Sequence, residues 1–600
     1  MRLTGGEIIV EYLIKEGVPY LVGIPGHGNV ALFDAIVDRR DRIRPFPVVH
    51  EQSAAHIADA YYRVSGRPLA ITTSIGPGAA NTTCGVAQAY VDSTAMLVIT
   101  GSTHTYMRGH SVLQEIDRTH WSNFPRVLEP VVKRWWDVTR VGQLPFVMHS
   151  AFNEMLSGRR GPVLIDLPMD VQAEAADVEL PEPAERRALR MPAGHPADLE
   201  RAAALLVQAK RPVMVVGGGA AYSPTAASDV RRIAEHLGAA VITTWHGKGI
   251  LPQDHELNAW HAGSIGTLCA NRLANQADVV LAVGTRFVDW LTGSYTSDVW
   301  RIPPAKLIHI DLDPREIGKN YPVEVGILAD AGTALAQLVD AVASAGPARA
   351  YRATEWFATI HQARQDYLDA FADIRESDRF PMSISRALAE MRKVAPRDSI
   401  WVSGAGNPQT QIHQELPFYE PRTHITSGGF STMGFTVPGA IGAQLAAGDR
   451  RVIGVSGDGD FMASLHEIAI AVQQQLPIVY VVMNNAAWQS IENLQVSVYG
   501  EARRMNTRFL TPGGANYSPD FVRVAEGFGA RASKVTSPDQ MGRALQEALD
   551  SGRTSVIEVP CAKELPYSGI KKYAWWDVPV PAYLEEARKA YEEARAGERL

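Results

Sequence analysis

The stretch Val452-Ile453-Gly454-Val455-Ser456-Gly457-Asp458-Gly459 is an apolar run that ends in a small turn around one carboxylate. A second apolar run, Pro477 to Met483, ends in Asn484-Asn485, and Asn485 follows Asp458 by 27 residues. Both runs are typical of buried parallel strands, and the residues between them, from about Ser464 to Gln475, have helical spacing. The sequence therefore predicts one βαβ unit, whose right-handed crossover brings Asp458 and Asn485 to the same edge of a sheet.

Asp458 and Asn485 together predict a divalent-cation site. A carboxylate and an amide oxygen are hard ligands that suit Mg²⁺, which takes its other ligands from water and from a phosphate group. A glycine beside the carboxylate lets the backbone approach a phosphate closely. The start of the next helix offers free N–H groups to the same anion. The residues expected to contact this phosphate are Gly457, Gly459, Asp460 and Phe461.

The spacing of the two motifs resembles that of thiamine diphosphate enzymes. The chain as a whole resembles the acetolactate-synthase-like group of these enzymes over nearly all of residues 1–560. The resemblance implies thiamine diphosphate and Mg²⁺ as cofactors. It implies that the metal ligands are Asp458, Asn485 and the main-chain carbonyl of Ala487. It also implies that the pyrimidine binds to one subunit and the diphosphate to another, so a homodimer or homotetramer with active sites at the subunit interface is expected.

Length and composition exclude several other classes of protein. The chain has 600 residues, of which 46% are hydrophobic, and a formal net charge of −7. These values are typical of a multidomain globular protein. We expect no nucleic-acid partner, because no basic run occurs, and no membrane span or signal peptide. The three cysteines are far apart in the sequence, which favours a reducing, cytoplasmic location.

The order of predicted elements indicates an α/β fold with three doubly wound parallel-sheet domains. A Pro- and Glu-rich segment, from about residue 173 to 196, and a second segment at 346–352 are expected to be linkers. The first and third domains are expected to share one topology. The predicted units are a pyrimidine-binding domain (1–178), a central nucleotide-binding-like domain (197–345), a diphosphate- and Mg-binding domain (375–562) and a tail that covers the active site (563–600).

Glu51 is the candidate acid–base residue of the first domain. It follows the apolar run Phe46–Val49 and begins a helix of small residues, which resembles the place where thiamine enzymes keep one glutamate. A carboxyl group that is hydrogen-bonded to the cofactor pyrimidine favours the tautomer that activates the thiazolium ring. Two further residues of this domain, Gln114 and His27, are expected to face the same cleft and are catalytic candidates.

Two more groups of residues are assigned by resemblance. The loop 427–435 resembles the pyrimidine-holding loop of the family, with Met433 as the wedge beneath the cofactor that forces its two rings into a V and the Ser431 carbonyl as a hydrogen-bond acceptor. Gly406 and Asn407 match the turn that contacts the diphosphate. The central domain has polar or glycine residues after three strands, which predicts a nucleotide-sized crevice. This pattern resembles the middle domain of acetolactate-synthase-like enzymes, and the resemblance implies ADP or FAD there, although some members hold neither. The residues expected to bind that nucleotide are Gly217, Arg286, Asp311 and Asp330.

The reaction remains open among four interpretations. Arg286-Phe287 and the segment Ile308–Pro314 resemble acetolactate synthase, a 2-keto acid carboligase, but Leu494 stands where those enzymes usually have Trp. The segments 26–30, 74–78 and 493–495 resemble a hydrolase of cyclic 1,2-diones in the inositol pathway. A catalytically inactive scaffold homologue is the third alternative.

The sequence favours the fourth interpretation, a lyase that cleaves a 2-hydroxyacyl-CoA to formyl-CoA and a ketone or aldehyde. Glu492 and the C-terminal tail resemble features of such enzymes in actinobacteria. An aromatic-rich tail can close a wide cleft against water. In this interpretation Glu492 and Gln114 move the protons. The substrate is then a small molecule, either an acyl-CoA or a keto compound.

Overall fold

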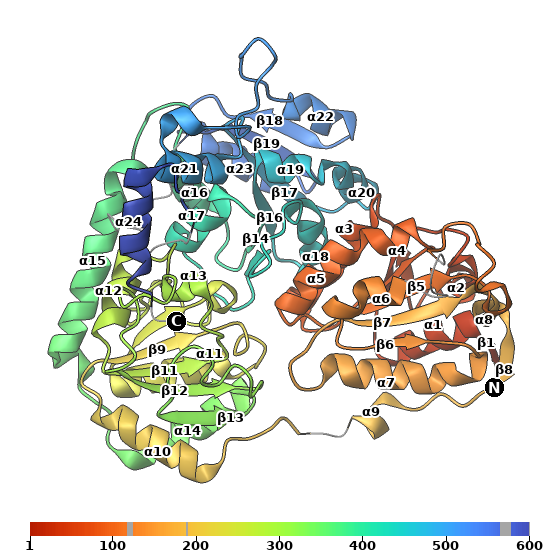
Figure 1. Cartoon of the computed structure of the whole chain (residues 1–600), viewed down its shortest axis with the longest axis horizontal. Coiled ribbons are helices and arrows are strands. Elements are labelled where there is room, and N and C mark those ends of the chain that lie inside the picture. The colour runs from red at the N-terminus through yellow and green to blue at the C-terminus, as the bar shows by residue number, and fades with distance from the viewer. Residues whose placement is uncertain (117–123, 188–189, 564–577, 599–600) are drawn as a thin grey trace.

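The computed structural model describes residues 1–116, 124–187, 190–563 and 578–598, and it confirms the predicted α/β class with three parallel-sheet domains (Figure 1). The first domain has a six-stranded parallel sheet covered by helices. Its strands in sheet order are β3 (Arg44–Phe46), β2 (Tyr20–Gly23), β4 (Ala70–Thr73), β5 (Leu97–Ser102), β7 (Val163–Pro168) and β6 (Trp135–Asp137). Its main helices are α1 (Gly5–Lys15), α3 (Glu51–Ser65), α5 (Thr83–Val91) and α7 (Leu144–Leu156). A short antiparallel pair, β1 (Arg2–Thr4) and β8 (Ala175–Asp177), ties the two ends of the domain together.

The central domain has a five-stranded parallel sheet. The order is β10 (Ala240–Thr243), β9 (Pro212–Val216), β11 (Val279–Val283), β12 (Lys306–Asp311) and β13 (Val325–Leu328). Its main helices are α10 (Pro196–Gln208), α11 (Ala226–Leu237), α12 (Leu268–Gln276), α14 (Ala331–Ala345) and α15 (Glu355–Arg375). Helix α15 follows the predicted second linker and buries its apolar side chains in the core of this domain.

The third domain has six parallel strands: β15 (His424–Thr426), β14 (Ile400–Ser403), β16 (Val452–Gly457), β17 (Ile478–Asn484), β19 (Ser555–Pro560) and β18 (Arg531–Lys534). The first and third sheets use their strands in the same order, which confirms the shared topology. The helices are α16 (Ile384–Val394), α17 (Asn407–Glu415), α18 (Thr436–Ala447), α19 (Asp458–Met462), α20 (Ile468–Gln473), α21 (Gln489–Tyr499), α22 (Phe521–Gly527) and α23 (Gln540–Asp550).

The predicted βαβ unit is present, with two local differences. Strand β16 continues to Gly457, so Asp458 is the first residue of helix α19 and not part of a loop. The helix expected between about residues 464 and 475 is divided into the 3₁₀ turn η7 (Leu465–Glu467) and α20. Ser464 has φ −145°, outside the helical region, so the helical residues begin only at Leu465.

The first and third domains pack through helices α3 and α18. Gly442 on α18 is required at this contact, because a Cβ there would lie 2.1 Å from the Ile57 carbonyl oxygen on α3. Small residues along α3, including Ala54 and Ala58, are fully buried at the same face. The helix that begins with Glu51 is therefore held directly by the helix that follows the Met433 loop.

The described part of the tail runs back to the central domain, and in Figure 1 its helix α24 (Glu585–Arg595) descends in that direction. The Tyr499 hydroxyl at the end of α21 donates to the Pro579 carbonyl at 3.0 Å, and Glu598 forms a bridge with Thr296. The aromatic residues on which the lid prediction depends lie outside the described residues; they are Tyr567, Tyr573, Trp575 and Trp576. No helix in the described part of the chain has the length and apolar character of a membrane span.

A buried lysine lies between the central and third domains. Lys248 is 1% exposed, and its Nζ lies 3.4 Å from the carbonyl oxygens of Ile412 and Leu416 and above the Phe418 ring. Burial lowers the pKa of its amine to about 7, and no ion pair reaches it within the described residues. The neighbouring bases are histidines whose pKa values burial also lowers: His261, His413 and His424.

Replacing this lysine by Met is expected to stabilise the protein. Because the Lys248 pKa falls from 10.5 to about 7 on folding, the unfolded chain binds the extra proton between these values. The wild-type stability should therefore rise with pH from 7 to 10, by up to about 1.4 kcal/mol per unit. Lys248→Met should remove this dependence. Thermal unfolding of both proteins from pH 7 to 10 checks it, and parallel pH curves would contradict it.

Candidate active site

A single cavity of about 1530 Å³ runs between the domains. It is lined by the three predicted metal ligands, Asp458, Asn485 and Ala487, which together form the metal cradle. The third domain contributes the turn after β14, the Met433 loop, the start of α19 and helix α21. The central domain contributes the turns after β9 and β11 and the start of α14, and the first domain closes one side with residues at the ends of α5 and α7. The cavity is long enough to join the metal cradle to the central crevice.

Asp458 and Asn485 lie side by side, as the strand order requires. Gly457 pairs with Met483 across β16 and β17. The Asp458 carboxylate accepts N–H groups from Gly459 at 2.8 Å, from Asn485 at 3.2 Å and from Ala486 at 2.6 Å. Burial raises the pKa of this carboxyl to about 6, although these N–H groups oppose the rise.

The residues present fit a bound Mg²⁺. The Asn485 Oδ1 is buried and has no hydrogen-bond donor within the described residues, so it is an acceptor that a cation would satisfy. The hydrogen bonds that flank Ala487 use the Ala486 carbonyl and the Trp488 N–H, and so they do not occupy the Ala487 carbonyl. Ala486 has φ +54°, a strained backbone of the kind that clusters at functional sites.

The turn around the cradle is shaped for a close ligand. A Cβ on Gly459 would lie 2.0 Å from the Trp488 ring, so only glycine fits here. Gly406 and Asn407 begin helix α17 and line the cavity. Asp460 also reaches the cavity, but its carboxylate is already bonded to the Gly434 N–H and the Thr436 hydroxyl. The side chain of Phe461 lies in the core, so this residue offers only its main chain.

The Met433 loop faces the same cavity. Ser431 and Met433 both line it, and Met433 remains 48% exposed, unusual for a large apolar side chain. Ser431 has φ +54°, another left-handed backbone without glycine. The Gly434 N–H bond to Asp460 fixes the end of the loop. This arrangement leaves the Met433 side chain free to contact a ligand above the cradle.

Glu51 and its predicted neighbours form a separate group on the first domain. The Glu51 Oε2 accepts from the Asn81 Nδ2 at 2.9 Å, and its Oε1 lies against Gly78. Gln114, with φ +69°, packs its main chain on Gly76 of the same Gly-Pro-Gly loop. Neither Glu51 nor Gln114 is among the residues that line the cavity.

His27 is exposed on the loop that precedes α2 (Val30–Asp34), and this loop packs on the start of the Gly-Pro-Gly segment through the Gly28 N–H bond to Ser74. It also lies outside the cavity lining. One chain therefore carries two half-sites, a cradle that opens on the cavity and an exposed group around Glu51.

Glu492 is engaged in a structural ion pair. It is 3% exposed, and its Oε1 accepts from Arg508 at 2.6 Å and from Arg504 at 3.1 Å. It is not among the residues that line the cavity. Because two arginines hold one oxygen of this carboxylate, the geometry favours a role in fixing the start of α21.

The central crevice contains three of the four predicted nucleotide residues. Arg286, Asp311 and Asp330 line the cavity, and the Asp330 carboxylate caps α14 by accepting the Thr333 N–H at 2.9 Å. Gly217 does not line it, because its missing side chain makes room for the Gly284 carbonyl. The next residues, Gly218 and Gly219, do line the cavity.

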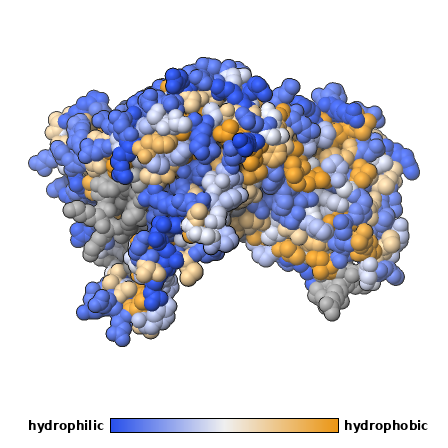
Figure 2. All heavy atoms as spheres, turned by 90° about the horizontal axis from the view of Figure 1, so that it is seen from above, coloured by the Kyte–Doolittle hydropathy of each residue, from blue (hydrophilic) through white to orange (hydrophobic). Residues whose placement is uncertain are grey.

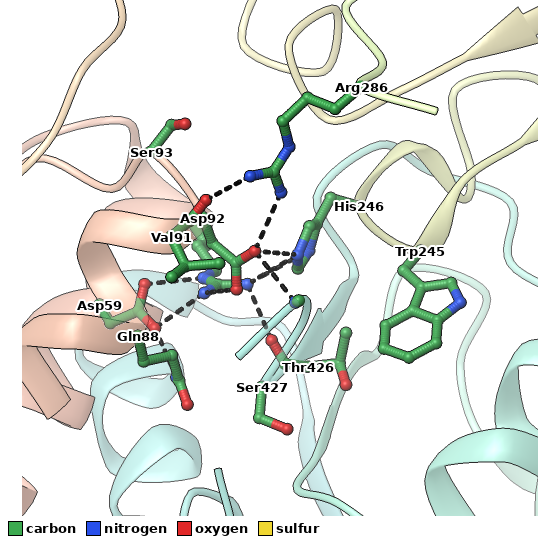
Figure 3. A network of polar contacts seen from close by, with 12 residues as sticks. Asp59, Gln88, Val91, Asp92, Ser93, Trp245, His246, Arg286, Thr426 and Ser427 are labelled. Atoms are coloured by element: carbon green, nitrogen blue, oxygen red, sulfur yellow. Dashed lines mark hydrogen bonds and ion pairs between the residues drawn. The ribbon is translucent and has the colours of Figure 1, made fainter. Parts of the chain in front are cut away.

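A buried charge network joins all three domains beside the cavity (Figure 3). Arg63 on α3 is 4% exposed and donates to Asp59 at 2.7 and 2.8 Å, to Asp92 at 3.1 Å and to the Thr426 carbonyl at 2.8 Å. Burial alone would lower the pKa of Arg63, but the two carboxylates raise it. Removing one partner from such a buried pair typically costs about 3–5 kcal/mol, so the network fixes the domain arrangement.

Asp92 is the hub of this network toward the central domain. Its carboxylate lies 3.5 Å from both Arg286 and His246 and accepts the Gly429 N–H at 3.1 Å. Arg286 also donates to the Val91 carbonyl at 2.6 Å. The predicted nucleotide arginine is therefore anchored to the first domain, and its guanidinium forms part of the cavity wall.

The polar face of α21 was not predicted. Gln489, Asn493 and Ser497 recur every four residues and line the cavity. The Gln489 Nε2 donates to the Asn493 Oδ1 at 2.7 Å, while its Oε1 is buried without a partner in the described residues. The i, i+4, i+8 spacing of polar residues was visible in the sequence and could have revealed this face.

Comparisons with known proteins match this arrangement domain by domain. The N-terminal TPP binding domain of thiamine pyrophosphate enzymes matches residues 3–121, the central domain 199–338 and the C-terminal TPP binding domain 404–559. The probable acetolactate synthase large subunit of Methanocaldococcus jannaschii is 33% identical over 567 residues, which cover 93% of this chain and 92% of that protein. The chain belongs to the thiamine pyrophosphate enzyme family.

Two further members of the family show similar coverage. The acetolactate synthase large subunit of Corynebacterium glutamicum is 33% identical over 93% of this chain and 86% of that protein. The acetolactate synthase isozyme 1 large subunit of Escherichia coli K12 is 33% identical over 93% of this chain and 94% of that protein. The predicted membership of the acetolactate-synthase-like group is confirmed.

Proposed function

We propose that this chain is a thiamine-diphosphate- and Mg²⁺-dependent carboligase that joins a 2-keto acid donor to a second carbonyl compound. The observation that carries this proposal is the similarity to acetolactate synthase large subunits over 93% of the chain, with the cradle residues in place. The interpretation that the sequence favoured, a 2-hydroxyacyl-CoA lyase, has no support from the names of these relatives.

Each half-site has a distinct task in this proposal. Asp458, Asn485 and the Ala487 carbonyl would hold Mg²⁺, and the N–H groups at the start of α19 would hold the diphosphate. Thiamine diphosphate held there would supply a carbon nucleophile for the reaction. Glu51 would hold the proton at the pyrimidine ring, and the Met433 side chain would support the cofactor from below.

The separation of the two half-sites supports a homodimer or homotetramer. Glu51 lies outside the cavity that contains the cradle, so a second copy is needed to bring a glutamate to it. On the face of the molecule shown in Figure 2, the side of the first domain has more hydrophobic surface than the opposite side. Exposed apolar residues of this domain include Val30, Tyr106, Met107, Leu113 and Ile116. Apolar surface of this kind is typical of an interface between copies.

A specific observation keeps the lyase as a second candidate. Leu494 lines the cavity where acetolactate synthases usually have Trp, and the Gln489–Asn493 pair gives the same wall polar groups. This wall has room and hydrogen-bonding capacity for an acceptor that is longer or more polar than a keto acid. A 2-hydroxyacyl-CoA or a cyclic 1,2-dione would both have such groups.

One set of assays tests the proposal. The purified protein, supplied with thiamine diphosphate and Mg²⁺, is incubated separately with pyruvate, 2-hydroxyisobutyryl-CoA and a cyclic 1,2-dione. We expect turnover of two pyruvate molecules to give one 2-hydroxy-2-methyl-3-keto acid, with the donor carboxyl group released as CO₂. Turnover of 2-hydroxyisobutyryl-CoA alone would contradict the carboligase proposal and support the lyase. Cofactor binding without turnover on any donor would favour the scaffold.

The central crevice is proposed to hold ADP or FAD. Its glycine turns, the α14 start and the anchored Arg286 form a wall suited to a nucleotide. Mass spectrometry of the small molecules released on denaturation identifies the ligand.

A further inference from the structure

A buried carboxyl group of the third domain contacts the first domain just before Glu51. Glu467 ends the 3₁₀ turn η7, and its side chain is fully buried. One of its oxygens, Oε1, accepts the N–H groups of both Val49 and His50 at 3.0 Å. These two residues immediately precede Glu51, although Glu467 is more than 400 residues away in the sequence.

This contact determines where helix α3 begins. Glu51 is the first residue of the helix, and His50 caps it by accepting the Gln52 N–H on Nδ1 at 3.2 Å. Because one oxygen holds two successive N–H groups, the main chain that enters the helix has little freedom. The position of the Glu51 Cα is therefore set by the third domain.

The side chain of Glu51 is held from the opposite direction. Its Oε2 accepts from Asn81, and its Oε1 rests on Gly78 in the Gly-Pro-Gly loop. The Asn81 bond orients the carboxylate, while Glu467 fixes the backbone to which that carboxylate belongs. Together they constrain a group whose task depends on placement within a fraction of an ångström.

The surroundings of Glu467 do not suggest an ordinary structural ion pair. Its neighbours are the Ser53 hydroxyl, the ring of His466 at 3.6 Å and the buried Tyr480. Within the described residues no lysine or arginine pairs with it. Burial raises the pKa of Glu467 to about 7, while Ser53 and the two N–H groups oppose the rise. A carboxyl group kept in such a place costs stability, which points to a function.

We propose that Glu467 is a positioning residue for Glu51, and that it acts by holding the N–H groups of Val49 and His50. The inference rests on the proposed role of Glu51 as the carboxyl group that handles the proton of the cofactor pyrimidine. The inference goes beyond that role, because it states that the position of Glu51 depends on a residue of the third domain, which also carries the metal cradle.

The first test uses the protein without cofactor. Glu467→Ala removes the acceptor, whereas Glu467→Gln keeps an oxygen at the same place. Hydrogen–deuterium exchange of the peptide that covers residues 46–57 should accelerate in the Ala variant and stay near wild type in the Gln variant. Unchanged exchange in the Ala variant would overturn the proposal, since the two N–H groups would then be held by something else.

The second test uses the protein loaded with thiamine diphosphate and Mg²⁺, without substrate. We expect Glu467→Ala to slow the exchange of the cofactor C2 hydrogen with D₂O by about 10- to 100-fold, the usual effect of a small misplacement. Cofactor affinity should be retained, and Glu467→Gln should restore the rate. An Ala variant with wild-type C2 exchange, or a Gln variant as slow as Ala, would overturn the proposal.

A matched control separates positioning from stability. Glu415 is also buried in the third domain, where its Oε1 accepts from Ser385, and it does not line the cavity. Glu415→Ala should lower the melting temperature and leave C2 exchange unchanged. If Glu467→Ala fails to fold, Glu467→Asp carries both tests, because it retracts the carboxylate by one methylene group. No readout involves a substrate, so failure of the carboligase proposal would leave these tests valid.

Discussion

The Asp458→Ala protein is expected to lose Mg²⁺-dependent binding of thiamine diphosphate. The Asp458 carboxylate is the only charged side chain among the three proposed protein ligands, and it is buried beside the acceptor oxygen of Asn485. Even outer-shell partners of a metal are worth about 10- to 100-fold in affinity, so removal of a direct ligand should cost more than about 100-fold. Isothermal titration calorimetry with cofactor and Mg²⁺ measures the loss.

A control in the same domain makes this result specific. Asp520 is exposed and caps helix α22 by accepting the Arg523 N–H at 3.0 Å, and it is not among the residues that line the cavity. Asp520→Ala should bind the cofactor like the wild type. Wild-type cofactor affinity in the Asp458→Ala protein would contradict the proposed metal site.

The same site predicts how cofactor affinity depends on pH. Burial raises the pKa of the Asp458 carboxyl to about 6, so this group takes up a proton below about pH 6. A metal ligand must be deprotonated, and affinity should therefore fall by up to about tenfold per pH unit below pH 6. Above pH 7 the affinity should be constant with respect to this group. A titration from pH 5 to 8 tests the direction.

The sequence predicted the relative positions of site residues best where the chain topology allows only one arrangement. Two consecutive parallel strands with a right-handed crossover must end at one edge, so Asp458 and Asn485 could be placed together. The structural roles of Glu467 and Asp92 could not be predicted in this way. Their contacts join different domains, and no local pattern specifies how three separately folded domains pack.

Side-chain direction was the other limit. Phe461 follows the phosphate-binding turn in sequence, but the helical twist of α19 turns its ring into the core. Glu492 was expected to move protons, and instead it is held by Arg504 and Arg508, which lie 12 and 16 residues further along. The two arginines reach Glu492 from a loop, and no periodic pattern in the sequence indicates such a contact. From the sequence alone, a glutamate in a buried ion pair therefore cannot be distinguished from an unpaired one.

The Glu51→Gln protein is expected to fold and bind the cofactor normally but to turn over at least about 10²-fold more slowly, the size of an acid–base contribution. Gln can accept the Asn81 hydrogen bond but cannot share a proton with a pyrimidine nitrogen. Steady-state kinetics with saturating cofactor measures the effect. Glu129, an exposed residue of the same domain, provides the control, since Glu129→Gln should have wild-type activity.

Mixing this variant with Asp458→Ala tests where the active site is assembled. Each variant alone should be inactive. If Glu51 of one copy completes the cradle of another, a mixed dimer has one site in which both halves are wild type. Unfolding and refolding the two variants together should then recover about one quarter of wild-type activity, because half of the dimers are mixed and each has one working site. No recovery, with subunit exchange demonstrated by mass spectrometry, would require both halves of a site to come from one chain, which the separation of Glu51 from the cavity opposes.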